Sequence, residues 1–143
     1  MEVRVASFAE LDPRTFHDLL RLRIDVFVVE QACPYPELDG RDVEPGTRHL
    51  WLGRAGGVLA YLRILAESDG TARIGRVVVA PYERGRGLAD RLVTEALRVV
   101  GDRPSELHAQ SHLTGWYRRY GFTVAGPEYV EDGIPHVPMR RPG

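Results

Sequence analysis

Residues 77–89 read Val77-Val78-Val79-Ala80-Pro81-Tyr82-Glu83-Arg84-Gly85-Arg86-Gly87-Leu88-Ala89. The run of β-branched valines predicts a strand. Beyond the loop, apolar residues recur at the spacing of an amphipathic helix that Gly101 is suited to end: Leu88, Leu92, Val93, Ala96 and Val99. A short loop with two glycines therefore connects the end of a strand to the beginning of a helix.

This loop has the features of an anion-binding site. Gly85 and Gly87 carry no Cβ atom, so successive backbone N–H groups can approach a phosphate closely. The first N–H groups of the following helix lack intrahelical partners and carry partial positive charge. Arg84 and Arg86 add full charges and paired donors. We therefore expect the loop to bind phosphate; the alternative is a glycine-rich turn with two solvated arginines.

Two common nucleotide motifs fit the loop poorly. A P-loop needs Lys followed by Ser or Thr after its last glycine, where this chain has Leu88 and Ala89. A dinucleotide fingerprint beginning at Gly85 needs Gly or Ala at Asp90, although Glu106 lies near the position of a ribose-binding acid. An acid on the first helical turn would also repel a pyrophosphate.

The sequence before the loop predicts an antiparallel meander. Strand-like runs cover residues 48–53, 58–65 and 74–80. Turn signals separate them, at residues 55–57 (Ala-Gly-Gly) and residues 68–71 (Ser-Asp-Gly-Thr). Successive strands joined by tight turns pair antiparallel, unlike the strands of a doubly wound nucleotide-binding sheet.

The remaining segments complete a mixed sheet. A strand over residues 2–6 precedes a helix that Asp12 caps and Pro13 begins, running to about residue 29. Residues 31–46 form a loop rich in Pro, Gly and acidic residues, long enough to be suspected of a function. After the second helix we expect a strand, a helix and two more strands, over residues 107–109, 113–120, 122–125 and 136–140. The fold class is therefore mixed α/β (α+β), in a single domain over residues 1–143.

Composition narrows the class of protein. The chain has 143 residues and a formal net charge of −1 at pH 7. This balance gives no broad electrostatic reason to expect nucleic acid or an acidic membrane as partner. Cys33 is the only cysteine, so no internal disulfide can form. No apolar run typical of a signal peptide or a membrane span is present, so we expect a cytoplasmic globular domain.

Four segments resemble the GNAT superfamily of N-acetyltransferases. Arg84-x-x-Gly87-x-Ala89 matches the superfamily's pyrophosphate motif, Gln/Arg-x-x-Gly-x-Gly/Ala, and residues 116–122 (Trp-Tyr-Arg-Arg-Tyr-Gly-Phe) match a second landmark. Further segments resemble the ElaA-like branch of this superfamily. They are residues 27–35 (Phe-Val-Val-Glu-Gln-Ala-Cys-Pro-Tyr), Asp39-Gly40, Arg48-His49 and residues 131–136 (Glu-Asp-Gly-Ile-Pro-His). The resemblance covers nearly the whole chain. It implies the GNAT-like acyl-CoA N-acyltransferase fold, with a central, mostly antiparallel sheet and helices on both faces.

The resemblance further implies that acetyl-CoA is the acyl donor. In the superfamily, the strand before the loop lends backbone groups to the pantetheine arm, and the next strand diverges to leave a gap for it. The cofactor-binding residues would then be Val77, Val78 and Val79 on the strand and Arg84, Gly85, Arg86, Gly87, Leu88 and Ala89 in the loop.

Tyr117 matches the tyrosine that commonly protonates the departing CoA thiolate in the superfamily, so the resemblance makes it the catalytic residue. On the sequence alone, Trp116, Tyr117 and Tyr120 are also compatible with ordinary core aromatics on a short helix. For Trp116 and Tyr120 we retain that interpretation.

The acceptor amine must react as a free base. An alkyl ammonium with the pKa of lysine lies about 3.4 units above pH 7, so deprotonation costs about 4.6 kcal/mol. A protein base is therefore useful, and the sequence leaves the candidates open: Glu30, His49, His112, Glu128 and His136. Residues Glu30, Asp39 and His49 are our candidates for contact with the acceptor, although a histidine on a central strand is more often a packed, hydrogen-bonded one. The acids between Glu30 and Glu44 would favour a cationic amine if they faced the acceptor.

We therefore expect an acetyl-CoA-dependent N-acetyltransferase that acts on a primary amine by direct transfer in a ternary complex. The amine would belong to a small molecule or a peptide, and a homodimer is an expectation from the superfamily. No metal is expected, because His108 and His112 do not share a helix and Cys33 is distant in sequence. Two alternatives stay open: an oxygen acceptor, or an acyl-CoA-binding sensor or partner-binding module that no longer turns over.

Overall fold

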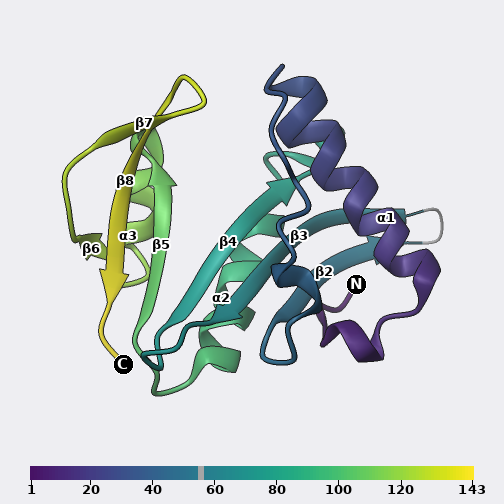
Figure 1. The fold of residues 1–143 in the computed structure, drawn as a ribbon, viewed down its shortest axis with the longest axis horizontal. Helices are drawn as coiled ribbons and strands as arrows, with labels where there is room; N and C mark the ends of the chain where they lie inside the picture. Colours follow the sequence, from purple (N-terminus) through teal and green to yellow (C-terminus); the bar gives the residue numbers. More distant parts are fainter. Residues whose placement is uncertain (55–56) are drawn as a thin grey trace.

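Residues 1–54 and 57–143 are described by the computed structural model of the chain (Figure 1). The predicted meander is confirmed, with antiparallel pairing from β1 (Arg4–Ala6) through β2 (Arg48–Arg54) and β3 (Gly57–Ala66) to β4 (Ala72–Val79). Gly70, at φ 88°, forms the expected turn between β3 and β4. The turn predicted at residues 55–57 falls largely on residues 55 and 56, which lie outside the described residues.

The second half of the chain extends the same sheet. Strand β5 (Ser105–Gln110) pairs parallel with β4, and β8 (Ile134–Arg141) pairs antiparallel with β5. Strands β6 (Thr123–Val124) and β7 (Tyr129–Glu131) both pair antiparallel with β8, giving an 8-stranded sheet in the order β1-β2-β3-β4-β5-β8-β6, with β7 beside β8. The expected mixed, mostly antiparallel sheet is confirmed.

Within the described residues, three α-helices accompany the sheet. Helix α1 (Pro13–Ile24) begins as predicted, because the Asp12 carboxylate accepts a hydrogen bond from the Thr15 backbone N–H at 2.9 Å. Helix α2 (Leu88–Val100) follows the glycine loop and ends at Gly101. Helix α3 (Thr114–Arg118) is a short helix after β5.

The helices cover both faces of the sheet, as expected. Helix α1 packs Leu19 and Leu22 against Tyr61 of β3 and Val78 of β4. Helix α2 packs on the other face, where Leu92 and Ala96 contribute to a cluster with the inward residues of the central strands, including Leu50, Leu62 and Ile74. Figure 1 shows α1 in front of the sheet and the fainter α2 behind it.

Two segments differ from the sequence-based expectation. The first helix leaves α-geometry after Ile24 and continues as a π-helical segment, Asp25–Glu30, in which the Gln31 N–H donates to the Val26 carbonyl at 3.1 Å. Strand β7 was not predicted. It pairs with β8 across Asp132 and Gly133, whose positive φ values of 53° and 77° suit a tight hairpin turn.

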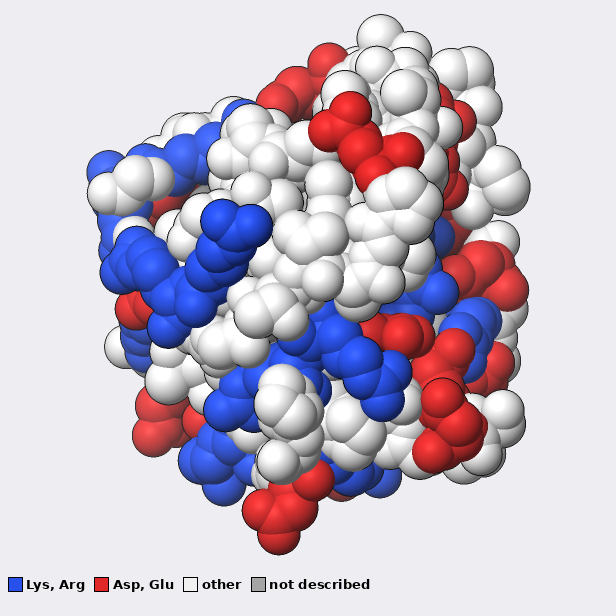
Figure 2. All heavy atoms as spheres, turned by 90° about the vertical axis from the view of Figure 1, so that its left-hand side faces the viewer, with Lys and Arg blue, Asp and Glu red and all other residues white. Residues whose placement is uncertain are grey.

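Charged side chains of both signs share the molecular surface. Every basic side chain apart from histidine is an arginine, because the chain contains no lysine. On the face drawn in Figure 2, arginines gather toward the left and lower parts, and acidic side chains lie at the top, at the bottom and at the lower right. This face therefore shows no continuous field of one sign.

Candidate active site

A β-bulge in β4 shapes the centre of the sheet. Tyr61 pairs with Val78 and Arg63 pairs with Gly75, so two β4 residues, Arg76 and Val77, stand opposite one β3 residue. Arg76 has φ of 53°, a left-handed conformation that is uncommon for a residue with a side chain. Bulges bend a strand and redirect its side chains.

Strands β4 and β5 separate soon after they meet. Their pairing is confined to Ala72 with Ser105 and Arg73 with Glu106, and Figure 1 shows the two strands diverging toward their C-terminal ends. Two hollows lie along this opening, one beside α2 and α3 and one beneath the β7–β8 hairpin. We call the hollow beside α2 and α3 the groove, and the hollow beneath the β7–β8 hairpin the inter-strand cavity.

The groove has a volume of about 560 Å³ and contains the predicted cradle. Its lining includes the valines and most of the loop residues proposed for the cofactor: Val77, Val78, Val79, Arg84, Gly85, Gly87, Leu88 and Ala89. Gly85 and Gly87 have φ of 81° and 76°, a conformation that favours glycine. The first bond of α2 runs from Arg91 N–H to Gly87 O, and the amides of residues 85–89 find no backbone acceptor within the described parts of the chain. These free donors fit a pyrophosphate.

The two cradle arginines are engaged with protein groups. Arg84 binds Glu30 through two hydrogen bonds, of 2.9 Å and 3.1 Å, and donates to the Val79 carbonyl at 3.2 Å. Arg86 lies 3.4 Å from Glu83 and does not line the groove. Arg84 therefore lies at the groove and Arg86 outside it, and the unpaired donors of this site are mainly backbone amides. Glu30 likewise lines the groove and holds Arg84, and it does not line the inter-strand cavity.

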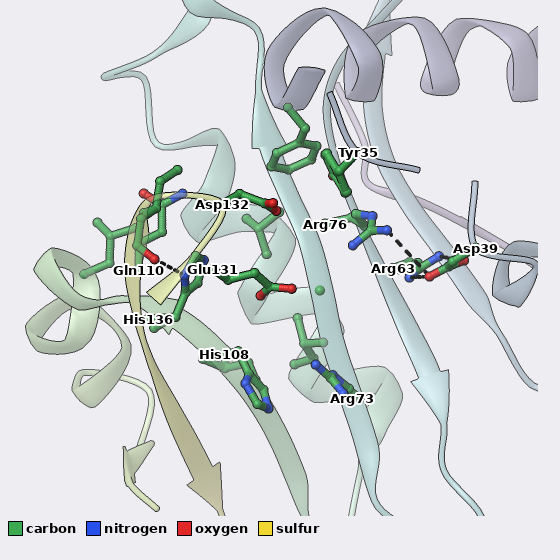
Figure 3. Close-up of a pocket in the computed structure, with 18 of the residues that line it drawn as sticks. Tyr35, Asp39, Arg63, Arg73, Arg76, His108, Gln110, Glu131, Asp132 and His136 are labelled. Atoms are coloured by element: carbon green, nitrogen blue, oxygen red, sulfur yellow. Dashed lines mark hydrogen bonds and ion pairs between the residues drawn. The ribbon is translucent and has the colours of Figure 1, made fainter. Parts of the chain in front are cut away.

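The inter-strand cavity has a volume of about 350 Å³ and meets the groove at a shared wall. Six residues line both hollows: Phe27, Gln31, Val77, Gln110, Leu113 and Tyr117. Figure 3 shows the cavity between β4 and β5, with Gln110 and His136 on one side and Arg63 and Arg76 on the other. A molecule in the cavity can therefore reach a molecule in the groove.

Tyr117 lies at the junction of the two hollows. Its side chain is 6% exposed and packs edge-on against Trp116 and Phe122, with ring centroids 4.9 Å and 6.1 Å away. Burial raises the pKa of its hydroxyl to about 12. The phenol therefore keeps its proton throughout the neutral range and can donate a hydrogen bond.

The acidic residues of the 31–46 loop turn inward onto arginines. Arg23 of α1 is fully buried and donates to Glu37 at 2.6 Å and to Asp42 at 2.9 Å. Asp39 lines the inter-strand cavity, but its carboxylate binds Arg63 and lies 3.5 Å from Arg76. Burial opposes ionisation of Asp39, yet the hydrogen bonds from Arg63 hold the pKa of this carboxyl well below its usual range. The loop is thus a neutralised wall, which removes the basis for expecting it to attract a cationic amine.

His49 does not reach either hollow, so the structure contradicts its proposal as an acceptor contact. The side chain is fully buried, with Nε2 3.0 Å from the Asp42 carbonyl and Nδ1 2.6 Å from the Tyr61 hydroxyl. Because a carbonyl only accepts, Nε2 carries the proton and Nδ1 accepts from Tyr61. Burial lowers the pKa of His49, which fits a neutral, structural imidazole.

Three polar residues of the cavity were missed or left unresolved by the sequence. His136 of β8, opposite Gln110 of β5, places Nδ1 2.7 Å from the Ile134 carbonyl. His108 places Nδ1 2.5 Å from the Tyr129 hydroxyl, and Arg73 lines the same cavity. The Asp132-Gly133 turn between Tyr129 and His136 is the sequence signal from which the pairing of β7 with β8 could have been predicted.

Neither a metal-binding cluster nor a membrane-spanning helix is found among the described residues. Within residues 1–54 and 57–143, no cluster of three or more His, Cys, Asp or Glu side chains is arranged to hold a metal ion. None of the helices in these ranges has the length and apolar character needed to cross a bilayer.

Sequence comparison relates the chain to acetyltransferases. The Acetyltransferase (GNAT) domain family matches residues 21–142. A UPF0039 protein of Mycobacterium tuberculosis is 51% identical over 138 residues, which cover 94% of this chain and 88% of that protein. Protein ElaA of Escherichia coli is 39% identical over 139 residues, which cover 93% of this chain and 91% of that protein.

Solved structures agree with this relationship. An acyl-CoA N-acyltransferase from Pseudomonas aeruginosa superposes with a TM-score of 0.94 at 44% identity, covering 98% of each chain. Escherichia coli ElaA superposes with a TM-score of 0.92 at 37% identity, also covering 98% of each chain. This chain belongs to the GNAT acetyltransferase family, in the branch of ElaA and the UPF0039 proteins.

Proposed function

We propose that the protein transfers the acetyl group of acetyl-CoA to a primary amine by direct attack, with both substrates bound at once. The observation that carries the proposal is the meeting of the groove and the inter-strand cavity at Val77 and Tyr117. A donor in the groove and an acceptor in the cavity would then react across this junction. Cys33 is a poor intermediate carrier, since burial and the nearby Asp132 carboxylate raise the pKa of its thiol.

The residues of the groove fit the donor. Bound acetyl-CoA would supply a thioester carbonyl that an uncharged amine can attack. The free amides of residues 85–89 would bind its pyrophosphate, and Val77, Val78 and Val79 would line its pantetheine arm. The Arg84–Glu30 pair would hold the cradle against the π-helical segment, since it joins residues 54 positions apart.

The donor assignment predicts a selective effect of Gly87→Glu. Wild-type protein should gain about 2.7 kcal/mol of stability when CoA is a hundredfold above its Kd, seen as a melting shift of several degrees. The variant should lose this shift, because a carboxylate beside the cradle amides repels phosphate. Gly70→Glu is the matched control: Gly70 has a similar φ, 88°, with open space around it, on the turn between β3 and β4.

Both variants should melt at similar temperatures without CoA, since both place a side chain in the left-handed region. A normal CoA-dependent melting shift in Gly87→Glu, or loss of that shift in both variants, would show that the loop of residues 84–89 does not bind the donor.

We assign the proton acceptor for the amine to His136. Its Nδ1 faces the Ile134 carbonyl at 2.7 Å, so Nδ1 carries the proton and the neutral ring keeps its lone pair on Nε2. The side chain lines the inter-strand cavity beside Gln110, which belongs to both hollows. An imidazole with a fixed tautomer is a suitable general base for an amine.

His136→Asn should therefore lower kcat by about 10²-fold or more, because general bases typically contribute about 10²–10⁴-fold. Asparagine keeps a donor near the Ile134 carbonyl but lacks a group in place of Nε2. His17→Asn, on the solvent side of α1 with 76% side-chain exposure, is the control and should keep wild-type turnover. Equal kcat values of both variants in steady-state assays would mean that His136 is not the general base and that solvent accepts the proton of the amine.

A further inference from the structure

The charges that line the inter-strand cavity divide into a paired group and an unpaired group. Arg41 lies 3.2 Å from Glu44, Arg63 lies 3.0 Å from Asp42, and Arg76 lies 3.1 Å from Glu37. Asp39 contacts Arg63 and Arg76. These groups neutralise one another and form the wall of the cavity.

Arg73 and Glu131 are different. Both line the cavity, and neither forms an ion pair or a side-chain hydrogen bond with any group in the described parts of the chain. Figure 3 shows Glu131 reaching from the hairpin into the space between β4 and β5, with His108 of β5 and Arg73 of β4 below it on opposite sides of the cavity. Asp132, next along the hairpin, also lines the cavity without an ion pair in the described parts of the chain, and its neighbour is the Cys33 thiol.

Arg73 and Glu131 lie around a common neighbour. Burial raises the pKa of Tyr129, the Glu131 charge raises it further, and the Arg73 charge opposes the rise. Burial also lowers the pKa of His108, and Arg73 contributes to that decrease. The Tyr129 hydroxyl and His108 Nδ1 are 2.5 Å apart, so Tyr129 contacts this group without lining the cavity. Arg73, His108 and Glu131 form one polar end of the cavity.

A ligand that satisfies this end carries both signs of charge. A guanidinium pairs best with a planar carboxylate, through two parallel hydrogen bonds. A carboxylate such as that of Glu131 pairs well with an ammonium group of a ligand. An α-amino acid offers both groups on one carbon, so its α-carboxylate would face Arg73 and its α-ammonium would face Glu131.

The reacting amine must then be a second one. Val77 at the junction lies four residues beyond Arg73 on β4, a separation of at most about 13 Å at about 3.3 Å per residue, because the bulge at Arg76 and Val77 shortens the strand. The proposal requires the Arg73 side chain to span part of this distance, and a four-carbon stem such as that of lysine would span the remainder.

Building on the proposed function, we propose that the acceptor is a free basic amino acid, held by Arg73 and Glu131 through its α-carboxylate and α-ammonium and acetylated on its terminal side-chain amine at the Tyr117 junction. The Arg63–Asp39–Arg76 wall would limit the cavity on the other side. The selectivity would therefore lie in Arg73 and Glu131.

Three amines test the proposal: lysine, cadaverine, which is lysine without its carboxylate, and 6-aminohexanoate, which is lysine without its α-amine. Wild-type protein should prefer lysine over each of the others in kcat/KM by about 10- to 100-fold, the value of a charge-assisted contact. Because the chain contains no lysine, acetylated product can be measured without background from protein side chains.

Variants separate the two contacts. Arg73→Gln should reduce the preference for lysine over cadaverine by about 10- to 100-fold, and Arg73→Lys should restore part of it. Glu131→Gln should reduce the preference for lysine over 6-aminohexanoate by a similar factor. Arg14→Gln, on the exposed part of α1, should change neither ratio.

The outcomes are distinguishable from failure of the proposed function. Acetylation of cadaverine and lysine with equal kcat/KM, or an unchanged ratio in Arg73→Gln, overturns the inference and leaves N-acetyltransfer intact. If no amine is acetylated although CoA shifts the melting temperature, the proposed function fails. In that case lysine added to the CoA complex should still raise the melting temperature of wild type but not of Arg73→Gln, and absence of this difference overturns the binding site itself.

Discussion

Tyr117→Phe should lower kcat by about 10²–10⁴-fold while leaving CoA affinity within a few fold of wild type. The substitution removes one hydroxyl from the junction of the groove and the inter-strand cavity. It leaves the ring packing against Trp116 and Phe122 in place. Only an interaction that strengthens as charge develops on the leaving sulfur is lost, so the effect belongs in kcat.

The raised pKa of Tyr117 decides which kind of help it gives. A thiol leaving group has a pKa near 8.5 as its conjugate acid, whereas burial raises the pKa of Tyr117 to about 12. Full proton transfer would therefore be uphill by about 5 kcal/mol. The hydroxyl instead stabilises the developing thiolate by donating a hydrogen bond, and another acid, such as solvent, protonates it after departure.

Steady-state kinetics and CoA titration of the same samples test this role. Tyr82→Phe is the matched control, because Tyr82 is 73% exposed beside the cradle and should tolerate loss of its hydroxyl. Ionisation of Tyr117 should cause no alkaline decline in kcat below about pH 10, since its neutral form persists up to its raised pKa. A variant with normal turnover per folded molecule and a lower melting temperature would make Tyr117 purely structural.

The cradle could be predicted because its determinants are local. A valine run, two glycines and a helical apolar pattern specify a strand, a turn and a helix within about 25 residues of sequence. The observed φ values of Gly85 and Gly87 follow from the same constraint, since both positions need the left-handed region.

Other features depend on contacts that are distant in sequence. Glu30 and Arg84 are separated by 54 residues, and Glu37 and Arg76 by 39, so no local pattern pairs them. The β4 bulge places the left-handed conformation on Arg76 although Gly75 stands beside it. Choosing the glycine for that conformation would have been the natural prediction, and it would have been wrong.

Strand β7 illustrates a different difficulty. It is three residues long, and its partner β8 contains Pro135 and Pro138, which weaken a strand pattern because proline donates no ladder hydrogen bond. The pairing holds because β8 is supported by β5 over residues 105–110. Tertiary contact therefore overrides a weak local propensity. The same pairing of β7 with β8 places Glu131 and His136 at the cavity.

Arg23→Met should lower the free energy of unfolding by about 3–5 kcal/mol, because it leaves buried carboxylates without their main cation. Arg23 is fully buried, and it joins α1 to Glu37 and Asp42 of the 31–46 loop. Many domains have only about 5–15 kcal/mol of stability in total, so the variant should be close to its unfolding threshold. Arg21→Met is the control on the same helix: its side chain is 75% exposed, with a weak pair to Asp25 at 3.9 Å, and the expected change is below about 0.5 kcal/mol.

Urea titration at several pH values separates lost ion pairing from lost packing. Burial alone would raise the pKa of Asp42, but hydrogen bonds from Arg23 and its charge hold that pKa below its usual range. A carboxyl with a lowered folded pKa contributes stability above its unfolded value, near 3.9, and loses it as the pH falls through the folded pKa. The gap between wild type and Arg23→Met should therefore be full at pH 7 and shrink below about pH 4. A gap that stayed constant across this range would mean that Arg23 acts through packing alone, with Arg63 and Arg76 sufficient to hold the loop carboxylates.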